Sequence, residues 1–407
     1  MKSEKKEAIP VPLKRGPDGI FFASYPVFAL VSDGQGLLIT GGGGGGKAYG
    51  VINYLQAHVV IQTPTSLTVE TIATLDTGAD APTALDYLNT QGGVWICAMG
   101  CHSMLFRFND DSLTIEPLFR WRTELGNERH LTNFAKIFSN PQNGHLHALT
   151  GGEDKTARLW LLTQEAGVGT RVTQAVLMAE LPEHQAEVVS CDVFGSEFLT
   201  TGKDGTVKLW SISNQSLITS ITPRSPDKKL ADQLLSIRAA YLIGNNNVVI
   251  LCHHHRGPAF LMLYSAANPA APLAAVQVTK AITPSIGISA SRDKVVVSHM
   301  EGEKSIYLVP SLRLVNRTTK KPHQMPPGKT AFVFDQLAVS GSPDFCLHFY
   351  EPNKTAGKSA CAWILIFILL LLVLAAAIFF LVPEGRAVMV QHVPVLQQIA
   401  DLRASEL

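Results

Sequence analysis

The sequence lacks an excess of charge of either sign. Lysine and arginine number 34 and aspartate and glutamate number 33, which gives a net charge of +1 over 407 residues. A protein whose main partner is nucleic acid usually presents a strongly basic surface. We therefore expect no nucleic-acid partner.

Cysteine is scarce and shows no repeated spacing. The six cysteines are Cys97, Cys101, Cys191, Cys252, Cys346 and Cys361. Disulfide-stabilised secreted domains normally have paired cysteines, so this pattern predicts a reducing compartment. Cys97, Cys101 and His102 lie close together, but no second ligand pair follows, so buried thiols are favoured and no metal is assigned.

The sequence also lacks a recognisable catalytic pattern. It contains neither a nucleophile–base constellation nor paired carboxylates, so we expect no enzyme with bond chemistry of its own and no small-molecule substrate. Residues 1–19 are rich in charge and have no apolar run, which leads us to expect no secretion signal.

One long apolar run is present near the C-terminus. Residues 361–382 are 22 consecutive uncharged, mostly large apolar residues. As a helix they would extend about 33 Å, enough to cross a hydrocarbon core of about 30 Å. We predict a flexible N-terminus (1–20), a cytosolic domain (21–352), a juxtamembrane linker (353–360), a transmembrane helix (361–382) and a short luminal tail (383–407).

Two internal segments match each other closely. Residues 149–160, LTGGEDKTARLW, resemble residues 199–210, LTTGKDGTVKLW. Each predicts an apolar strand, a tight turn around Asp154 or Asp204, and a second strand that ends in Trp160 or Trp210. This is the pattern of WD repeats, in which a preceding histidine bonds the turn aspartate. His184 fits that structural role for Asp204.

Weaker copies extend the repeat along the chain. The further strand-end candidates share an apolar, aromatic-rich sequence, and they are residues 50–54, 104–108, 261–264, 305–308 and 346–350. With the two tryptophan strands they predict seven blades of four strands. The expected fold class is an all-β, seven-bladed WD-repeat β-propeller followed by a single C-terminal transmembrane helix.

A run of six glycines follows an apolar strand in the first predicted blade. The run is Gly41, Gly42, Gly43, Gly44, Gly45 and Gly46, and Lys47 comes next. A phosphate-binding loop would need a hydroxyl after the lysine, and Ala48 stands there. Six glycines are costly to order, so two interpretations stay open: a surface loop, or a close backbone approach to an ion or a protein.

Together these segments resemble one family. Residues 25–30, the strand running into the glycines, Lys47, residues 50–53, both tryptophan strands and the C-terminal run resemble the WD-repeat exchange factors of the endoplasmic reticulum, the prolactin regulatory element-binding protein family. Members of this family promote GDP release from a Sar-type small GTPase, which starts COPII coat assembly and transport from endoplasmic reticulum to Golgi.

The resemblance implies specific roles. The glycine loop would enter the GTPase, with Val51 or Ile52 as the inserted apolar residue and with Lys47 and Asn53 beside it. The resemblance also leaves open that a monovalent cation, such as potassium, binds at Gly41–Gly46 as the sole cofactor. The protein would be a single-pass endoplasmic reticulum membrane protein with a cytosolic N-terminal domain. The alternative is a membrane-anchored WD-repeat scaffold without exchange activity.

Overall fold

The computed structural model describes residues 11–44, 50–90, 93–164, 172–230 and 233–351. The chain separates into two compact units, Met1–Pro352 and Asn353–Leu407, and the account below concerns the first. Within the described residues, none of the helices is both long enough and apolar enough to cross a membrane. The predicted span at 361–382 lies outside those residues.

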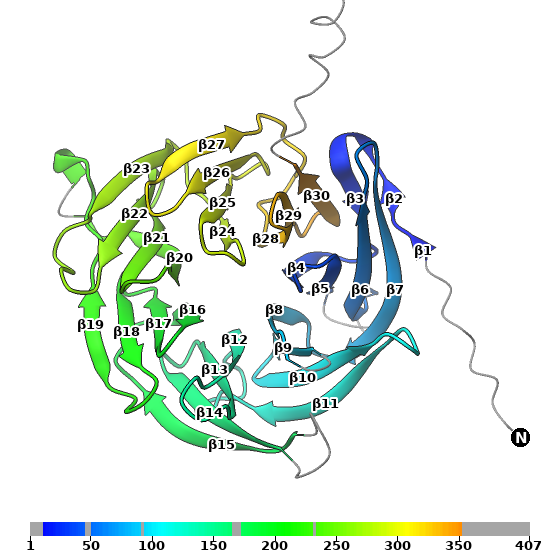
Figure 1. Cartoon of the computed structure of the whole chain (residues 1–407), viewed down its shortest axis with the longest axis horizontal. Helices are drawn as coiled ribbons and strands as arrows, with labels where there is room; N and C mark the ends of the chain where they lie inside the picture. Colours follow the sequence, from blue (N-terminus) through cyan, green and yellow to red (C-terminus); the bar gives the residue numbers. More distant parts are fainter. Residues whose placement is uncertain (1–10, 45–49, 91–92, 165–171, 231–232, 352–407) are drawn as a thin grey trace, which may run out of the picture. The chain divides into compact units, whose positions relative to one another are not determined.

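The described strands form seven sheets of four or five strands each. The sheets are arranged around a common axis as the blades of a propeller (Figure 1). Each innermost strand lies against that of the next blade, and β28 lies against β4, so the ring is closed. The all-β, seven-bladed prediction is confirmed.

We call the blades I to VII in chain order. The four strands of each of the blades II to VI are antiparallel neighbours that follow one another in sequence, and the first and last blades add strands from the start of the chain. Blades I to III are built by β4 (Val27–Ser32), β5 (Leu37–Gly42), β6 (Asn53–Gln62), β7 (Leu67–Gly78); β8 (Pro82–Leu88), β9 (Val94–Met99), β10 (His102–Asn109), β11 (Thr114–Arg122); and β12 (Thr132–Ser139), β13 (Leu146–Gly152), β14 (Ala157–Gln164), β15 (Val172–Leu181). Blades IV to VII are built by β16 (Val188–Phe194), β17 (Glu197–Gly202), β18 (Val207–Ser211), β19 (Leu217–Ile221); β20 (Ser236–Leu242), β21 (Asn247–His253), β22 (Ala259–Ser265), β23 (Ala274–Thr279); β24 (Ser285–Ile288), β25 (Lys294–Ser298), β26 (Lys304–Leu308), β27 (Arg313–Arg317); and β28 (Lys329–Phe334), β29 (Leu337–Gly341), β30 (Cys346–Tyr350). In the part of the chain that the structure describes, two short 3-10 helices, η1 (Pro17–Gly19) and η3 (Lys228–Leu230), lie in connections.

Residues from the start of the chain complete the last blade. β3 (Ile20–Phe22) pairs with β30, and β2 (Lys14–Arg15) pairs with β3, so blade VII takes its outer strands from the N-terminus. β1 (Val11–Pro12) pairs with β7 of blade I. Residues 11–20, assigned from the sequence to a flexible N-terminus, are therefore strands and a 3-10 helix. Their pairing partners lie more than 300 residues away in the case of β30, which local sequence cannot reveal.

The middle strands of each blade form the core. Every residue of β9 and of β13 is buried, because neighbouring blades cover both faces of these strands. The outermost strands have one free face, and four of the five residues of β19 are wholly or partly exposed. The position of a strand from the axis outward therefore explains its sequence pattern.

The weaker repeat copies correspond to third strands, with one shift. Four of them lie within β10, β22, β26 and β30. In blade I the third strand is β6, which begins at Asn53, so the predicted segment 50–54 covers the turn and only the first two residues of the strand. The third strand of blade I therefore begins later in the chain than the predicted segment does, after the glycine run.

Candidate functional site

The turn between β5 and β6 begins with glycines that are required by close packing. We call the propeller face that carries the turns between second and third strands the upper face; it includes residues 43–44, 50–52, 203–206 and 342–345. A Cβ atom at Gly41 would lie 2.7 Å from Cβ of Pro82, and one at Gly42 would overlap the Pro26 carbonyl. These first glycines allow β5 to contact its neighbours directly.

The next two glycines continue this constraint. Gly43 has a φ of +146° and its amide donates to the Pro26 carbonyl at 3.1 Å. A Cβ at Gly44 would lie 2.7 Å from Cβ of Val51, on the returning side of the turn. Gly50 also needs a positive φ, of +79°. Gly45, Gly46 and Lys47 lie outside the described residues. Gly44 and Gly50 therefore occupy constrained positions on the upper face.

Asn53 lies at the base of this turn. Its side chain is fully buried, and Nδ2 donates to the carbonyls of Gly78 (2.9 Å) and Ala79 (3.0 Å). Gly78 is the last residue of β7, and Ala79 begins the connection to blade II. Asn53 therefore ties the turn to the end of β7 and to the connection that leaves it, a positioning role, while Val51 and Ile52 are only partly buried.

A buried hydrogen-bonded cluster supports β5 below the turn. The Thr40 hydroxyl lies 2.6 Å from the Tyr25 hydroxyl and 2.8 Å from Nε2 of His58, and all three residues are fully buried. Burial lowers the pKa of His58 to about 3, so its ring is neutral. The cluster fixes the strand from which the glycines start.

Blade IV has an equivalent cluster built from the residues that the repeat predicted. His184 contacts Asp204 through Nδ1 (2.9 Å) and Thr200 through Nε2 (2.9 Å), and Trp210 donates to the same hydroxyl at 3.0 Å. Thr40 therefore matches Thr200, and His58 occupies the place of the tryptophan. Blade I keeps the geometry of the repeat with different side chains, which is why its repeat signal is weak in sequence.

Blade III contains a variant of this cluster. Trp160 donates to Thr150 at 2.8 Å, as Trp210 does to Thr200. Asp154, however, accepts from Arg158 and from the Thr156 amide (3.0 Å) rather than from a histidine. An arginine from the following strand thus replaces the histidine of blade IV.

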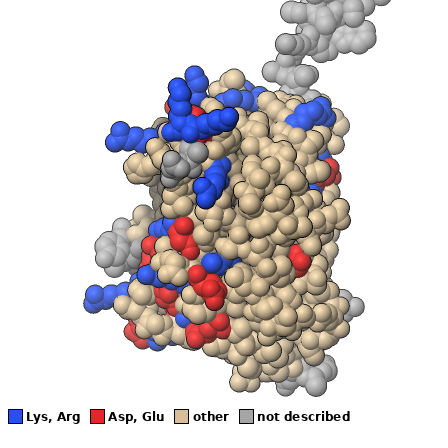
Figure 2. Space-filling view, turned by 90° about the vertical axis from the view of Figure 1, so that its left-hand side faces the viewer, with Lys and Arg blue, Asp and Glu red and all other residues tan. Residues whose placement is uncertain are grey.

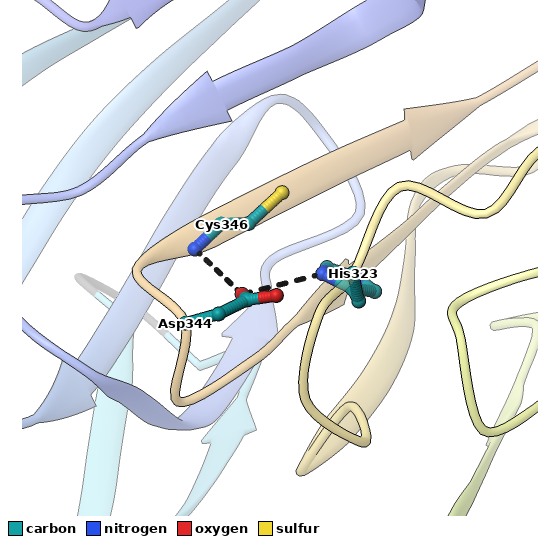
Figure 3. Close-up of side chains that lie close together, drawn as sticks. All are labelled: His323, Asp344 and Cys346. Atoms are coloured by element: carbon teal, nitrogen blue, oxygen red, sulfur yellow. Dashed lines mark hydrogen bonds and ion pairs between the residues drawn. The ribbon is translucent and has the colours of Figure 1, made fainter.

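Blade VII holds a cluster that the sequence analysis missed. His323, Asp344 and Cys346 have potential metal-ligating atoms within 4.8 Å of one another (Figure 3). His323 also contacts Ser340 through Nε2 at 2.8 Å, and its Nδ1 faces Asp344 at 3.5 Å. His323 precedes Ser340 by 17 positions, and His184 precedes Thr200 by 16, a spacing that could have revealed it.

This equivalence explains the cluster without a metal. Burial raises the pKa of the Cys346 thiol to about 12, which disfavours the thiolate that metals bind. Asp344 accepts from the amides of Gln324 (2.6 Å) and Cys346 (3.1 Å) and so holds the turn. The three residues stabilise blade VII as His184 and Asp204 stabilise blade IV.

The propeller axis contains a cavity of about 250 Å³ that is lined by the innermost strands of all seven blades. Charged side chains from four blades meet in it. Asp86 lies 3.1 Å from Nζ of Lys136, which in turn lies 3.6 Å from Asp192. Arg292 makes a bidentate ion pair with Asp192 and stacks on Phe194 at 4.6 Å.

This network is electrostatically paired. Burial works to lower the pKa of Lys136, but the carboxylates of Asp86 and Asp192 outweigh it and raise that pKa. Asp192 and Arg292 are 100 residues apart in the chain, so no local sequence pattern predicts their pairing.

The outer surface carries charges of both signs. On the side drawn in Figure 2, basic side chains gather near the top of the picture, and acidic and basic side chains mix lower down.

Comparisons with known proteins support the fold. Residues 175–211 match the family model "WD domain, G-beta repeat", a segment that contains His184, Asp204 and Trp210. The chain folds as a seven-bladed WD40 propeller. No curated protein sequence matches the chain.

Two solved structures are similar to it in fold. The WD40 β-propeller domain of Doa1 is 14% identical with a TM-score of 0.58, and the match covers 85% of this chain and 97% of that one. Raptor of Chaetomium thermophilum is 13% identical with a TM-score of 0.62, and the match covers 87% of this chain and 30% of that one. At these identities the likeness concerns the WD40 propeller fold alone.

Proposed function

We propose that this WD40 propeller is a guanine nucleotide exchange factor for a Sar-type small GTPase, anchored in the endoplasmic reticulum membrane by residues 361–382. The observation that carries the proposal is the anchored turn between β5 and β6. Gly43, Gly44 and Gly50 adopt backbone positions that side chains would disturb, and buried Asn53 binds the turn to the end of β7 and the connection after it.

An exchange factor needs differential binding rather than bond chemistry. It must favour the nucleotide-free GTPase over the nucleotide-bound form, so that GDP dissociates faster. A rigid base that presents Val51 and Ile52 at its edge suits insertion of an apolar wedge, because less loop entropy is lost when the complex forms. In this proposal Asn53 is a positioning residue, and Val51 or Ile52 makes the contact. Lys47 remains part of the proposal from the family resemblance.

The test is GDP release from the GTPase. The full-length protein should accelerate release of fluorescent GDP, and Ile52→Ala or Val51→Ala should reduce that rate at least tenfold. The matched control is Ile218→Ala on β19, whose side chain is 46% exposed on the outer rim; it should exchange like the wild type. Asn53→Ala should lose activity together with some thermal stability, because it removes buried hydrogen bonds.

A scaffold without exchange activity is the second candidate, favoured by the fold itself, since propellers present many surfaces for binding. It predicts that the GTPase binds while GDP release is unchanged. That outcome would reject the exchange proposal even if the interaction were strong.

A further inference from the structure

The axial cavity carries more positive than negative charge. Its charged lining residues are four cations, Lys136, Arg238, Arg292 and Lys329, and two carboxylates, Asp86 and Asp192. Both carboxylates are already bound by Lys136 and Arg292. The remaining excess therefore resides on Lys329 and Arg238.

Lys329 has no anionic partner. It is the first residue of β28 and is partly buried, and its ammonium group makes no hydrogen bond or ion pair with any described residue. Burial lowers its pKa, as expected for a cation without a carboxylate beside it. A partly buried cation that no carboxylate pairs leaves its charge to be balanced by water or by an anion in the cavity.

Arg238, which is exposed, also has no carboxylate partner among the described residues. Its Nε donates to Nε2 of His253 at 2.8 Å, and the other nitrogen of that ring lies 2.7 Å from the His254 carbonyl, to which it donates. The ring is therefore neutral, with burial as the main cause of its lowered pKa. Nη1 and Nη2 of Arg238 make no hydrogen bond or ion pair with the described residues.

The two free cations lie toward one end of the cavity. Arg238 is near the start of β20 and Lys329 is at the start of β28, and these strands flank β24. Inner strands begin at the upper face, whereas Arg292 follows β24 at the opposite end. The upper half of the cavity is thus the unpaired half.

We propose that the upper half of the axial cavity binds a small dianion of the phosphate class between Lys329 and Arg238. An excess of two positive charges matches a dianion, and Arg with Lys is the usual pair for a phosphate group. A volume of about 250 Å³ is below the roughly 300–1,000 Å³ typical of drug-sized ligands, so the site suits an ion or a small phosphate monoester. The site is independent of the proposed exchange activity.

The experiment measures the melting temperature of the full-length protein against inorganic phosphate at constant ionic strength. The wild type should show a saturable rise with phosphate and none with chloride. Lys329→Met should melt higher than the wild type in phosphate-free buffer, because a partly buried, unpaired charge is removed, and should need at least tenfold more phosphate for the same rise. Lys280→Met, which removes an exposed lysine, should behave like the wild type.

Two further variants keep the test decisive. Arg238→Gln, at an exposed position, should also weaken the phosphate response about tenfold, and Lys329→Arg should preserve it. A small phosphate monoester in place of phosphate distinguishes the free ion from an esterified group as the bound form. An unchanged phosphate response in both Lys329→Met and Arg238→Gln, or an equal response to chloride, would overturn the proposal.

Discussion

Lys304 illustrates how a single buried residue sets a pH dependence. It is the first residue of β26, it is fully buried, and its Nζ lies 2.6 Å from Nδ1 of His348 on β30. Burial lowers the pKa of Lys304 to about 7 and that of His348 to about 2. Near neutral pH a partly deprotonated amine therefore donates to a neutral ring across the interface of blades VI and VII.

The lowered pKa predicts that stability rises with pH. Between about pH 7 and 10.5 the unfolded chain keeps the lysine proton that the folded protein has released, so unfolding takes up a proton. The contribution of Lys304 to the free energy of unfolding should grow by up to about 1.4 kcal/mol per pH unit in that window. Lys304→Met should lack this contribution and be more stable than the wild type at pH 7.

Chemical denaturation at a series of pH values checks this prediction. The difference between wild type and Lys304→Met should shrink as the pH rises from 7 toward 10. Lys280→Met, at an exposed lysine, should give a curve parallel to the wild type. A constant difference between wild type and Lys304→Met at all pH values would show that burial does not shift this pKa.

Among the elements, β3 is a short strand that joins the start of the chain to the last blade by pairing with β30. Phe21 is 2% exposed and packs edge-on against Phe349 of β30, with ring centroids 5.4 Å apart. Its neighbour Phe22 points to the other side of the strand and is 41% exposed. The two residues share a strand and a chemistry but differ in burial.

Phe21→Ala should therefore destabilise the propeller by about 3–5 kcal/mol, the usual cost of removing a buried phenylalanine ring. Phe22→Ala is the matched control and should cost less than about 1 kcal/mol. Urea denaturation followed by tryptophan fluorescence measures both. Equal losses in the two variants would mean that β3 contributes through its backbone pairing alone.

Sequence reasoning succeeded where the structure is local and failed where it is not. The turn aspartate, its histidine and the strand tryptophan of blade IV lie within one repeat, so Asp204, His184 and Trp210 could be predicted. Blade I uses Tyr25 and His58 for the same geometry, and those substitutions hide its repeat. The pairing of β3 with β30 and of Asp192 with Arg292 depends on ring closure, which no window of sequence contains.

For the whole molecule, the membrane proposal places the propeller in the cytosol and residues 383–407 in the lumen. The propeller carries two glycan acceptor sequences, at Asn214 and Asn316, and Asn214 lies exposed in a turn between β18 and β19. In the proposed topology neither asparagine meets the luminal oligosaccharide machinery. Both should therefore stay unmodified although Asn214 is accessible.

A single substitution supplies the luminal reporter. Arg403→Asn completes an acceptor sequence with Ala404 and Ser405 in the tail. Expressed in eukaryotic cells, the wild type should run as a single unglycosylated band, and Arg403→Asn should gain one glycan that endoglycosidase H removes. Adding Ser405→Ala should abolish that shift, because the hydroxyl residue of the acceptor is lost. A wild type that is glycosylated in the propeller, with no shift from Arg403→Asn, would reverse the topology and separate the glycine turn from a cytosolic GTPase.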